Sequence, residues 1–187
     1  MNRRYQLVPN KLLLLIILIH LGCNNNKSES EIINNLFGKE FNLPDHIVLF
    51  EKYEMDTVSI QYFKSNIKII SIIDGRCPAC IKELNNFINV KTRIQRKTNS
   101  SIDYLFFIYT EDFKMFTQNF YPLLDFDSPI LLTKDLSFLE KDHLSGFGKY
   151  RTVLTINNKI KLVGNPAVNK QLEDLYIDEI NNYTKGN

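Results

Sequence analysis

The segment Ile69–Asn89, IISIIDGRCPACIKELNNFIN, carries three sequence signals in order. It begins within an apolar run, Ile67–Ile73, which is typical of a buried β-strand and stops at the turn-forming pair Asp74-Gly75. A Cys-x-x-Cys sequence follows at Cys77–Cys80. Beyond it, apolar residues recur at helical spacing at Ile81, Leu84, Phe87, Ile88 and Ile94. The segment therefore predicts a strand, a tight turn, a dithiol and an amphipathic helix.

The dithiol lies where such an element would make one thiol reactive. Cys77 falls at the N-terminus of the predicted helix, where free backbone N–H groups and the helix dipole favour an anion. The thiolate is the nucleophile in disulfide exchange, so this placement suits that chemistry. Cys80 faces the same side of the first turn and is close enough to pair with Cys77. Cys-x-x-Cys also occurs in zinc and iron–sulfur sites, but the flanking strand and helix favour a redox dithiol.

Two segments resemble sequences of known redox proteins. Cys77–Leu84, CPACIKEL, resembles the active-site helix of TlpA-like thioredoxin-fold oxidoreductases, in which Lys-Glu-Met/Leu often follows the second cysteine. Phe37–Pro44, FGKEFNLP, resembles the opening of redoxin-type domains. The resemblance implies an α/β thioredoxin-like fold, with a mixed central sheet, helices on both faces and an N-terminal β-extension. It also implies that Cys77 and Cys80 form a redox-active disulfide, with no other cofactor and no metal.

The remaining periodicities predict the elements of that fold in order. The expected strands are residues 57–63, 67–73, 102–109, 129–132, 152–156 and 159–163. The last two flank Asn157-Asn158, which suits a tight hairpin. The first lies beside the 67–73 strand or pairs with part of Ile47–Phe50. Besides the dithiol helix, the expected helices are residues 111–120 with Thr110 as cap, 135–143 and 168–183.

The first 22 residues are interpreted as a lipoprotein signal peptide. Arg3, Arg4 and Lys11 form a basic region that precedes the apolar run Leu12–Ile19. This run is too short to span a bilayer, because a spanning helix needs about 20 residues. The end of this region, HLGC at residues 20–23, resembles the lipobox of bacterial lipoproteins, in which the cysteine is acylated. His20 stands where Leu is usual. The alternative is an ordinary secretory signal or an uncleaved anchor.

The lipobox resemblance implies boundaries within the chain and a location for the protein in the cell. It implies lipid on Cys23, a polar and flexible tether over residues 23–35, and a thioredoxin-like domain over residues 36–187. The domain would be lipid-anchored in the bacterial cell envelope and would face the periplasm. Asn24 replaces the Asp that favours inner-membrane retention in some bacteria, which slightly favours the outer membrane.

The number of cysteines and the net charge limit the classes of function that fit this chain. The chain has three cysteines, so lipid on Cys23 would leave only Cys77 and Cys80 to pair. So short a loop constrains the unfolded chain little, and the pair is interpreted as reactive rather than structural. Export places it in an oxidising compartment. Without the three basic residues of the leader, 20 of the 23 basic residues remain against 21 acidic ones, which gives no electrostatic case for nucleic-acid binding.

Near the dithiol the sequence departs from the family pattern. Arg76 replaces the usual Trp, and its guanidinium is expected to stabilise the Cys77 thiolate, the alternative being a solvated surface arginine. Ser71 replaces the buried acid of thioredoxins. Glu83 matches a helix Glu of the family and is interpreted as a charge on an exposed face rather than as a proton relay. Pro78, between the cysteines, does not by itself set the reduction potential.

A further departure is Arg151, which stands where the family has a cis-proline facing the dithiol. A non-proline cis bond costs about 3 kcal/mol, so the Tyr150–Arg151 peptide is expected to be trans. If this loop keeps its position, the Arg151 guanidinium faces Cys77 and, together with Arg76, lowers the pKa of that thiol. The change also removes a residue that in the family helps to keep metals off the dithiol.

Two functions of different classes fit these features. The first is a membrane-anchored thiol–disulfide oxidoreductase that exchanges disulfides with exported proteins, with Cys77 attacking and Cys80 resolving the mixed disulfide. Its partners would be exported protein disulfides or thiols and an electron donor. The second is a non-catalytic thioredoxin-fold lipoprotein that acts as a binding or metal-holding module. Two cysteines are short of the four ligands of a structural zinc site, and His46 and His143 lie far from them in sequence.

Overall fold

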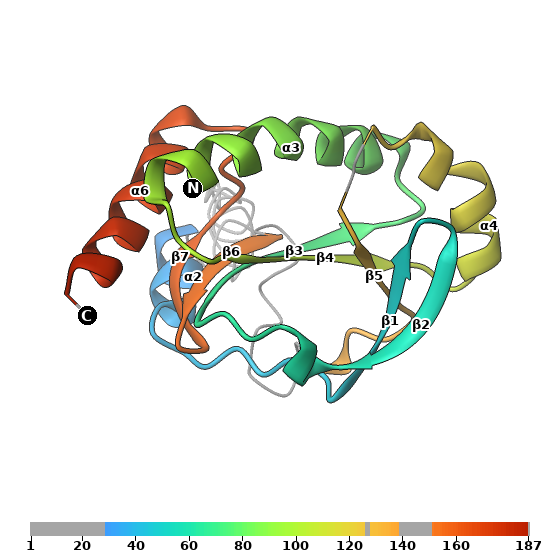
Figure 1. Ribbon diagram of the computed structural model, residues 1–187, viewed down its shortest axis with the longest axis horizontal. Coiled ribbons are helices and arrows are strands. Elements are labelled where there is room, and N and C mark those ends of the chain that lie inside the picture. The colour runs from blue at the N-terminus through green and yellow to red at the C-terminus, as the bar shows by residue number, and fades with distance from the viewer. Residues whose placement is uncertain (1–28, 126–127, 139–150, 187) are drawn as a thin grey trace, which may run out of the picture.

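The computed structural model describes residues 29–125, 128–138 and 151–186. They form a seven-stranded sheet with the strand order β2-β1-β5-β4-β3-β6-β7 (Figure 1). The strands are β1 (His46–Glu51), β2 (Glu54–Ser59), β3 (Ile67–Asp74), β4 (Asp103–Tyr109), β5 (Ile130–Thr133), β6 (Thr152–Ile156) and β7 (Lys159–Val163). Strands β3, β4 and β5 are parallel to one another, whereas β6 and β1 pair with them antiparallel. The predicted mixed sheet is therefore confirmed.

Strand β3 lies in the interior of the sheet because it is apolar on both sides. Seven of its eight residues are buried. Ile69 and Ile73 belong to the core on one face, and Ile70 and Ile72 to the core on the other. Continuous apolar runs of this kind are typical of strands covered on both faces. The parallel pairing of β3 with β4 brings the C-terminal ends of both strands to one edge of the sheet, and the dithiol follows β3 at that edge.

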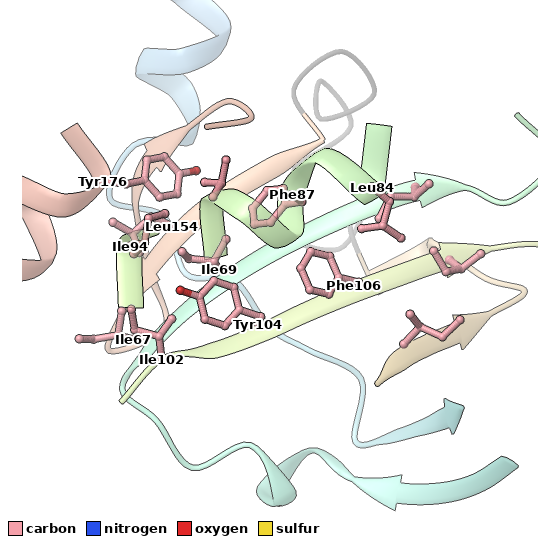
Figure 2. Packing of buried hydrophobic residues seen from close by; sticks show 14 of the residues in the cluster. Ile67, Ile69, Leu84, Phe87, Ile94, Ile102, Tyr104, Phe106, Leu154 and Tyr176 are labelled. Atoms are coloured by element: carbon pink, nitrogen blue, oxygen red, sulfur yellow. The ribbon is translucent and has the colours of Figure 1, made fainter. Parts of the chain in front are cut away.

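Helix α3 (Pro78–Thr98) is the predicted dithiol helix, and it covers one face of the sheet (Figure 2). Its N-cap is Cys77, and it ends at Asn99 in the left-handed conformation that commonly closes a helix. The ring of Phe87 on α3 packs edge-on against the ring of Phe106 on β4, and the two ring centroids are 5.2 Å apart. The buried face of the helix consists of Ile81, Leu84, Phe87, Val90, Ile94 and Thr98.

Helix α6 (Lys170–Lys185) packs beside α3 and confirms the predicted terminal helix, shifted by two residues. An ion pair joins the two helices. Glu173 is only 1% exposed, and its carboxylate accepts hydrogen bonds from Arg93 Nε at 2.9 Å and Arg93 Nη2 at 2.7 Å. These bonds hold the pKa of Glu173 below its usual range. The pair fixes α6, and with it the loop that precedes α6, against α3.

Helix α2 (Glu29–Leu36) corrects the prediction of a flexible tether for residues 29–35, whereas residues 23–28 of the predicted tether lie outside the described residues. Leu36 is buried, and Ile32 packs with it on the face of the sheet opposite α3. Residues 29–36 are thus amphipathic, with an apolar side that the sheet buries. Helices accordingly lie on both faces, as predicted (Figure 1). The predicted signal peptide and Cys23 lie outside the described residues.

The N-terminal β-extension is the β1–β2 hairpin. Strand β2 pairs with β1 from His46↔Ser59 to Glu51↔Glu54, and β1 joins the sheet through β5. Of the two pairings expected for this strand, the one with residues 47–50 is therefore confirmed. The strand ends at Ser59, earlier than predicted, because a 3-10 helix, η1 (Ile60–Tyr62), follows with the Ser59 side chain as its cap.

The hairpin predicted at Asn157-Asn158 is also confirmed. Both residues have the positive φ that a two-residue turn between β6 and β7 favours. The helix predicted over residues 135–143 extends beyond the described residues. No helix within the described ranges is both long enough and apolar enough to span a membrane.

Helix α4 (Phe113–Asn119) starts two residues later than predicted because Asp112, and not Thr110, caps it. The Asp112 carboxylate accepts a hydrogen bond from Met115 N at 2.9 Å. Thr110 is instead fully buried, and its backbone N–H donates to the carbonyl of Thr133. A 3-10 helix, η2 (Tyr121–Leu123), continues from α4. Together α4 and η2 lie at the end of the sheet near the start of α3 (Figure 1).

Candidate active site

The turn between β3 and α3 presents the dithiol at one edge of the sheet. Gly75 N donates to the carbonyl of Tyr109 at 2.8 Å, and Cys77 N donates to the carbonyl of Asp74 at 3.1 Å. A Cβ on Gly75 would lie 2.7 Å from Ile108 Cγ2 and 3.1 Å from the Tyr109 carbonyl oxygen. This close approach to β4 therefore requires glycine. The turn is anchored to β4 and places Cys77 at the start of α3.

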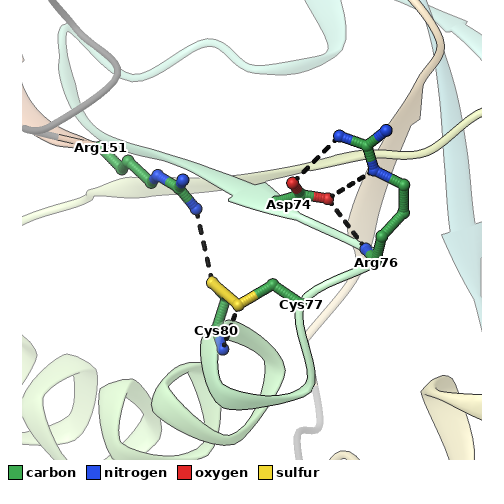
Figure 3. The surroundings of a disulfide bond; sticks show 5 residues. All are labelled: Asp74, Arg76, Cys77, Cys80 and Arg151. Atoms are coloured by element: carbon green, nitrogen blue, oxygen red, sulfur yellow. Dashed lines mark hydrogen bonds and ion pairs between the residues drawn. A yellow bond between two sulfur atoms is a disulfide. The ribbon is translucent and has the colours of Figure 1, made fainter.

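Cys77 and Cys80 form a disulfide across the first turn of α3 (Figure 3). Cys77 Sγ accepts a hydrogen bond from Cys80 N at 3.2 Å. Pro78 occupies the first helical position, where a missing N–H removes no helical bond. After reduction, the Cys80 N–H and the positive end of the helix dipole would both stabilise a thiolate on Cys77. The two cysteines therefore lie at the N-terminus of a helix, as the sequence predicts.

Arg76 turns toward Asp74 and away from the disulfide (Figure 3). Its Nε lies 3.0 Å from Asp74 Oδ1 and its Nη2 lies 3.2 Å from Oδ2. The guanidinium also lies over the ring of Tyr109, 5.3 Å from the centroid. The hydrogen bonds from Arg76 hold the pKa of Asp74 below its usual range. Since this carboxylate offsets the positive charge, stabilisation of the Cys77 thiolate by Arg76 stays a prediction.

Arg151 reaches the disulfide from the opposite side (Figure 3). Its carbonyl accepts a hydrogen bond from Ile72 N at 2.7 Å, which ties the residue to β3 just before β6 begins. Its Nη1 lies 3.5 Å from Cys80 Sγ. The expectation that Arg151 faces the dithiol is therefore met, but the contact is with Cys80 and not with Cys77. None of the described peptide bonds is cis, whereas Tyr150 lies outside the described residues.

A pocket of about 500 Å³ lies beside Cys80, among α3, the β3–β6 pair and the loop that leads into α6. Arg151 and Glu83 both line it, and apolar side chains of α3 and α6 form much of its wall. Glu83 is half-buried, and its Oε1 accepts a hydrogen bond from Asn165 Nδ2 at 2.7 Å. The interpretation of Glu83 as a charge on an exposed face is therefore wrong. Its carboxylate shares a pocket with the second cysteine.

The position of the buried acid of thioredoxins is neutral in this protein. Ser71 is 4% exposed, and its hydroxyl lies 2.9 Å from the hydroxyl of Thr152 on β6. Both residues line the pocket beside Cys80. Among the described residues that line it, Glu83 is the one carboxylate. Within the described residues, a carboxylate in this pocket therefore comes from α3 and not from β3.

Two residues of the site, Asp74 and Asn165, are not among the site residues predicted from the sequence. Asp74 stands two residues before Arg76 in the predicted turn, so local spacing could have indicated their ion pair. Asn165 lies 82 residues from its partner Glu83. No local pattern joins these two residues, because the contact depends on how the loop before α6 folds back over α3.

Metal ligands do not gather in the described part of the chain. Residues 29–125, 128–138 and 151–186 contain no group of three or more His, Cys, Asp or Glu side chains that could hold a metal ion. His46 is exposed at the start of β1, and His143 lies outside these ranges.

Comparison with known proteins finds matches in structure. No protein-family model and no curated protein matches the chain. The thioredoxin domain of a thiol-disulfide oxidoreductase from Bacteroides vulgatus matches with a TM-score of 0.51 at 14% identity, covering 73% of this chain and 97% of that one. A thiol:disulfide interchange protein from a Bacteroides species gives 0.51 at 12% identity, with coverages of 75% and 90%. A proposed thiol:disulfide interchange protein, DsbE, from Chlorobium tepidum gives 0.54 at 11% identity, with coverages of 77% and 97%.

The fold is therefore thioredoxin-like, as the resemblance at Cys77–Leu84 implies. The matched structures span most of this chain and most of their own length, so the likeness includes the sheet and the helices on both faces. At these sequence identities the likeness establishes the fold, and the activity has to be argued from the site.

Proposed function

We propose that this protein is a thiol–disulfide oxidoreductase in which Cys77 and Cys80 alternate between a dithiol and a disulfide. The observation that carries the proposal is the Cys77–Cys80 disulfide at the N-terminus of α3, beside a pocket, in a thioredoxin-like fold. A disulfide that closes so short a loop adds little to stability. Its position at a helix N-terminus instead suits a reactive thiolate. The names of the matched structures are consistent with this chemistry.

The proposed exchange runs through two substitutions at sulfur. The Cys77 thiolate attacks one sulfur of a substrate disulfide, forms a mixed disulfide and expels the other substrate sulfur as a thiolate. The Cys80 thiolate then attacks Cys77 Sγ, forms the Cys77–Cys80 disulfide and expels the second substrate thiolate. The enzyme loses two electrons, and the substrate gains two electrons and takes up two protons. The reverse sequence oxidises a substrate dithiol, and no further cofactor is needed.

The surrounding residues suit the second step. Cys80 has to lose its proton before it attacks, and Glu83 is the carboxylate of the described pocket wall that could accept it. The Arg151 guanidinium, 3.5 Å from Cys80 Sγ, would stabilise the resulting thiolate. Asn165 holds the Glu83 side chain in place through its 2.7 Å hydrogen bond. We therefore assign proton transfer to Glu83 and charge stabilisation to Arg151.

Reduction of insulin by dithiothreitol tests this function. The protein should accelerate the precipitation of the insulin B chain well above the uncatalysed rate, because it offers a faster route for thiol–disulfide exchange. The same protein with both thiols blocked by N-ethylmaleimide after reduction serves as the matched control. An untreated protein that is no faster than the blocked one would contradict the proposed function and favour a non-catalytic binding module.

We further propose that the protein is a lipoprotein of the bacterial envelope that faces the periplasm, with the outer membrane slightly favoured. The support is the apolar run before Cys23 and the lipobox-like residues 20–23. Its partners would then be exported protein disulfides or thiols and an electron donor on the same side of the membrane.

Replacing Cys23 by serine should release the domain from membranes or block processing, because the thiol that carries the lipid is lost. Membrane fractionation and metabolic labelling with a palmitate analogue measure the effect. Asn25→Ser, two residues further on, is the matched control and should behave like the wild type. A Cys23→Ser protein that stays in the membrane fraction and migrates like the wild type would contradict the lipid anchor.

A further inference from the structure

A second hollow lies at the start of α3, where Pro78 from the dithiol turn lines it. It measures about 270 Å³ and lies between the start of α3 and η2. Pro78, the residue between Cys77 and Ala79, forms part of its wall, and the buried Ile81 side chain lies beneath it. Phe120 and Leu123 form the opposite wall, and Leu123 is 65% exposed. Large exposed apolar side chains beside a hollow are typical of interaction sites.

The walls of this hollow are held in a fixed arrangement. The Asn85 side chain on α3 bonds the backbone of the opposite wall twice, donating to the Leu123 carbonyl at 3.1 Å and accepting from Asp125 N at 3.0 Å. The Tyr121 ring, also on η2, contacts the rings of Phe50 and Tyr53 at centroid distances of 4.6 and 5.2 Å. These contacts connect η2 to α3 and to the β1–β2 hairpin, so the fold holds both walls of the hollow in place.

We propose that this hollow docks the polypeptide that carries the target disulfide, by receiving one apolar side chain next to the target cysteine. The proposal deepens the function proposed for the dithiol and rests on it. The exposed Pro78-Ala79 turn lies between Cys77 and this hollow, so a chain whose sulfur bonds to Cys77 and that runs over this turn reaches the hollow. An extended chain advances about 3.4 Å per residue, so a side chain one to three positions from the target cysteine reaches the hollow.

The chemistry of the hollow selects a peptide over a small disulfide. Its described lining is mostly apolar, and Lys82 is the one charged residue among the described residues that line it. A bulky apolar residue near the target cysteine, with an acidic neighbour to meet Lys82, is therefore the preferred substrate feature. A small hydrophilic disulfide has no group to place there and would react at Cys77 without using the hollow.

The proposal is tested with two synthetic peptides that each contain one intramolecular disulfide. The peptides are identical except at one position, two residues from a cysteine, where one has Leu and the other has Ser. Reduced protein should reduce the Leu peptide about fivefold faster at low concentration, the ratio expected for partial burial of one leucine side chain. Leu123→Asp should abolish this preference and leave the reduction of bis(2-hydroxyethyl) disulfide unchanged. Leu175→Asp changes an exposed leucine on α6, away from the hollow, and should keep the preference.

The outcomes separate docking from chemistry. If the protein reduces bis(2-hydroxyethyl) disulfide but reduces both peptides at equal rates, or if Leu123→Asp keeps the preference, the docking proposal is wrong and the proposed function stands. If neither the peptides nor the small disulfide is reduced, the proposed function is wrong, and the docking proposal falls with it. Circular dichroism of both variants verifies that each has the wild-type fold.

Discussion

Replacing Cys77 by serine should lower catalysed insulin reduction by at least about a hundredfold, to the uncatalysed background, because the serine hydroxyl is not a nucleophile toward disulfides at neutral pH. Replacing Cys80 by serine should have a different consequence. Cys77 still attacks, but nothing resolves the mixed disulfide, so a covalent complex with the substrate accumulates. Non-reducing gels and intact-mass spectrometry measure that complex directly.

The assignment of the two roles depends on which variant traps the substrate. Ala79→Ser, an exposed change in the same turn, is the matched control and should neither abolish reduction nor trap a complex. A covalent complex that accumulates with Cys77→Ser, and not with Cys80→Ser, would reverse the roles proposed for the two cysteines. Equal activity in the wild type and Cys77→Ser would remove the dithiol from the chemistry altogether.

Replacing Arg151 by glutamine should raise the pKa of the Cys80 thiol and make the reduction potential of the Cys77–Cys80 couple more negative. The guanidinium lies 3.5 Å from Cys80 Sγ, so it stabilises the thiolate of the reduced form, whereas the disulfide carries no charge to stabilise. Removing it therefore destabilises the reduced form. A pKa change of up to about one unit corresponds to a change of up to about 30 mV, reduced by solvent screening at this partly exposed site.

Arg151→Lys is the matched control because it keeps the positive charge and should recover much of the wild-type potential. Both variants are compared with the wild type in glutathione redox buffers at low salt, where screening is weakest. Thiol pKa values follow from the pH dependence of alkylation, read separately for Cys77 and Cys80 by mass spectrometry. If Arg151→Gln shifts the pKa of Cys77 and leaves that of Cys80 unchanged, the contact with Cys80 does not govern the reactivity of the site. If neither value moves, Arg151 is a surface residue without a role in the exchange.

The sequence predicts the part of the fold whose signals are local. Ile69–Asn89 contains the apolar run, the Asp-Gly turn, the dithiol and the helical spacing within 21 residues, and the structure forms these elements in that order. The Asn157-Asn158 hairpin is predicted equally well, because its turn chemistry lies within two residues. The cap of α4 was misassigned by two residues because Thr110 and Asp112 are both acceptable caps, and only the structure shows Thr110 buried.

Features that depend on distant contacts were missed or misjudged. Helix α2 was expected to be a tether because its sequence is polar overall, and only the sheet against which Ile32 and Leu36 pack makes it a helix. Glu83 was placed on an exposed face because the loop that carries Asn165 is remote in sequence. Arg151 was expected at Cys77 for a similar reason. Its actual contact with Cys80 follows from its hydrogen bond to Ile72, which no local pattern reveals.

The reduction potential of the Cys77–Cys80 couple shows whether this disulfide can be exchanged reversibly. The protein is equilibrated in buffers of defined dithiothreitol or glutathione redox ratio, and its free thiols are then trapped with acid and an alkylating agent. Mass spectrometry of the trapped protein gives the fraction that is oxidised. We expect a reversible two-electron transition with a potential between about −270 and −120 mV, the range of thioredoxin-fold exchange proteins. A disulfide that stays closed to below about −300 mV, as structural disulfides do, would contradict the proposal that this protein exchanges disulfides.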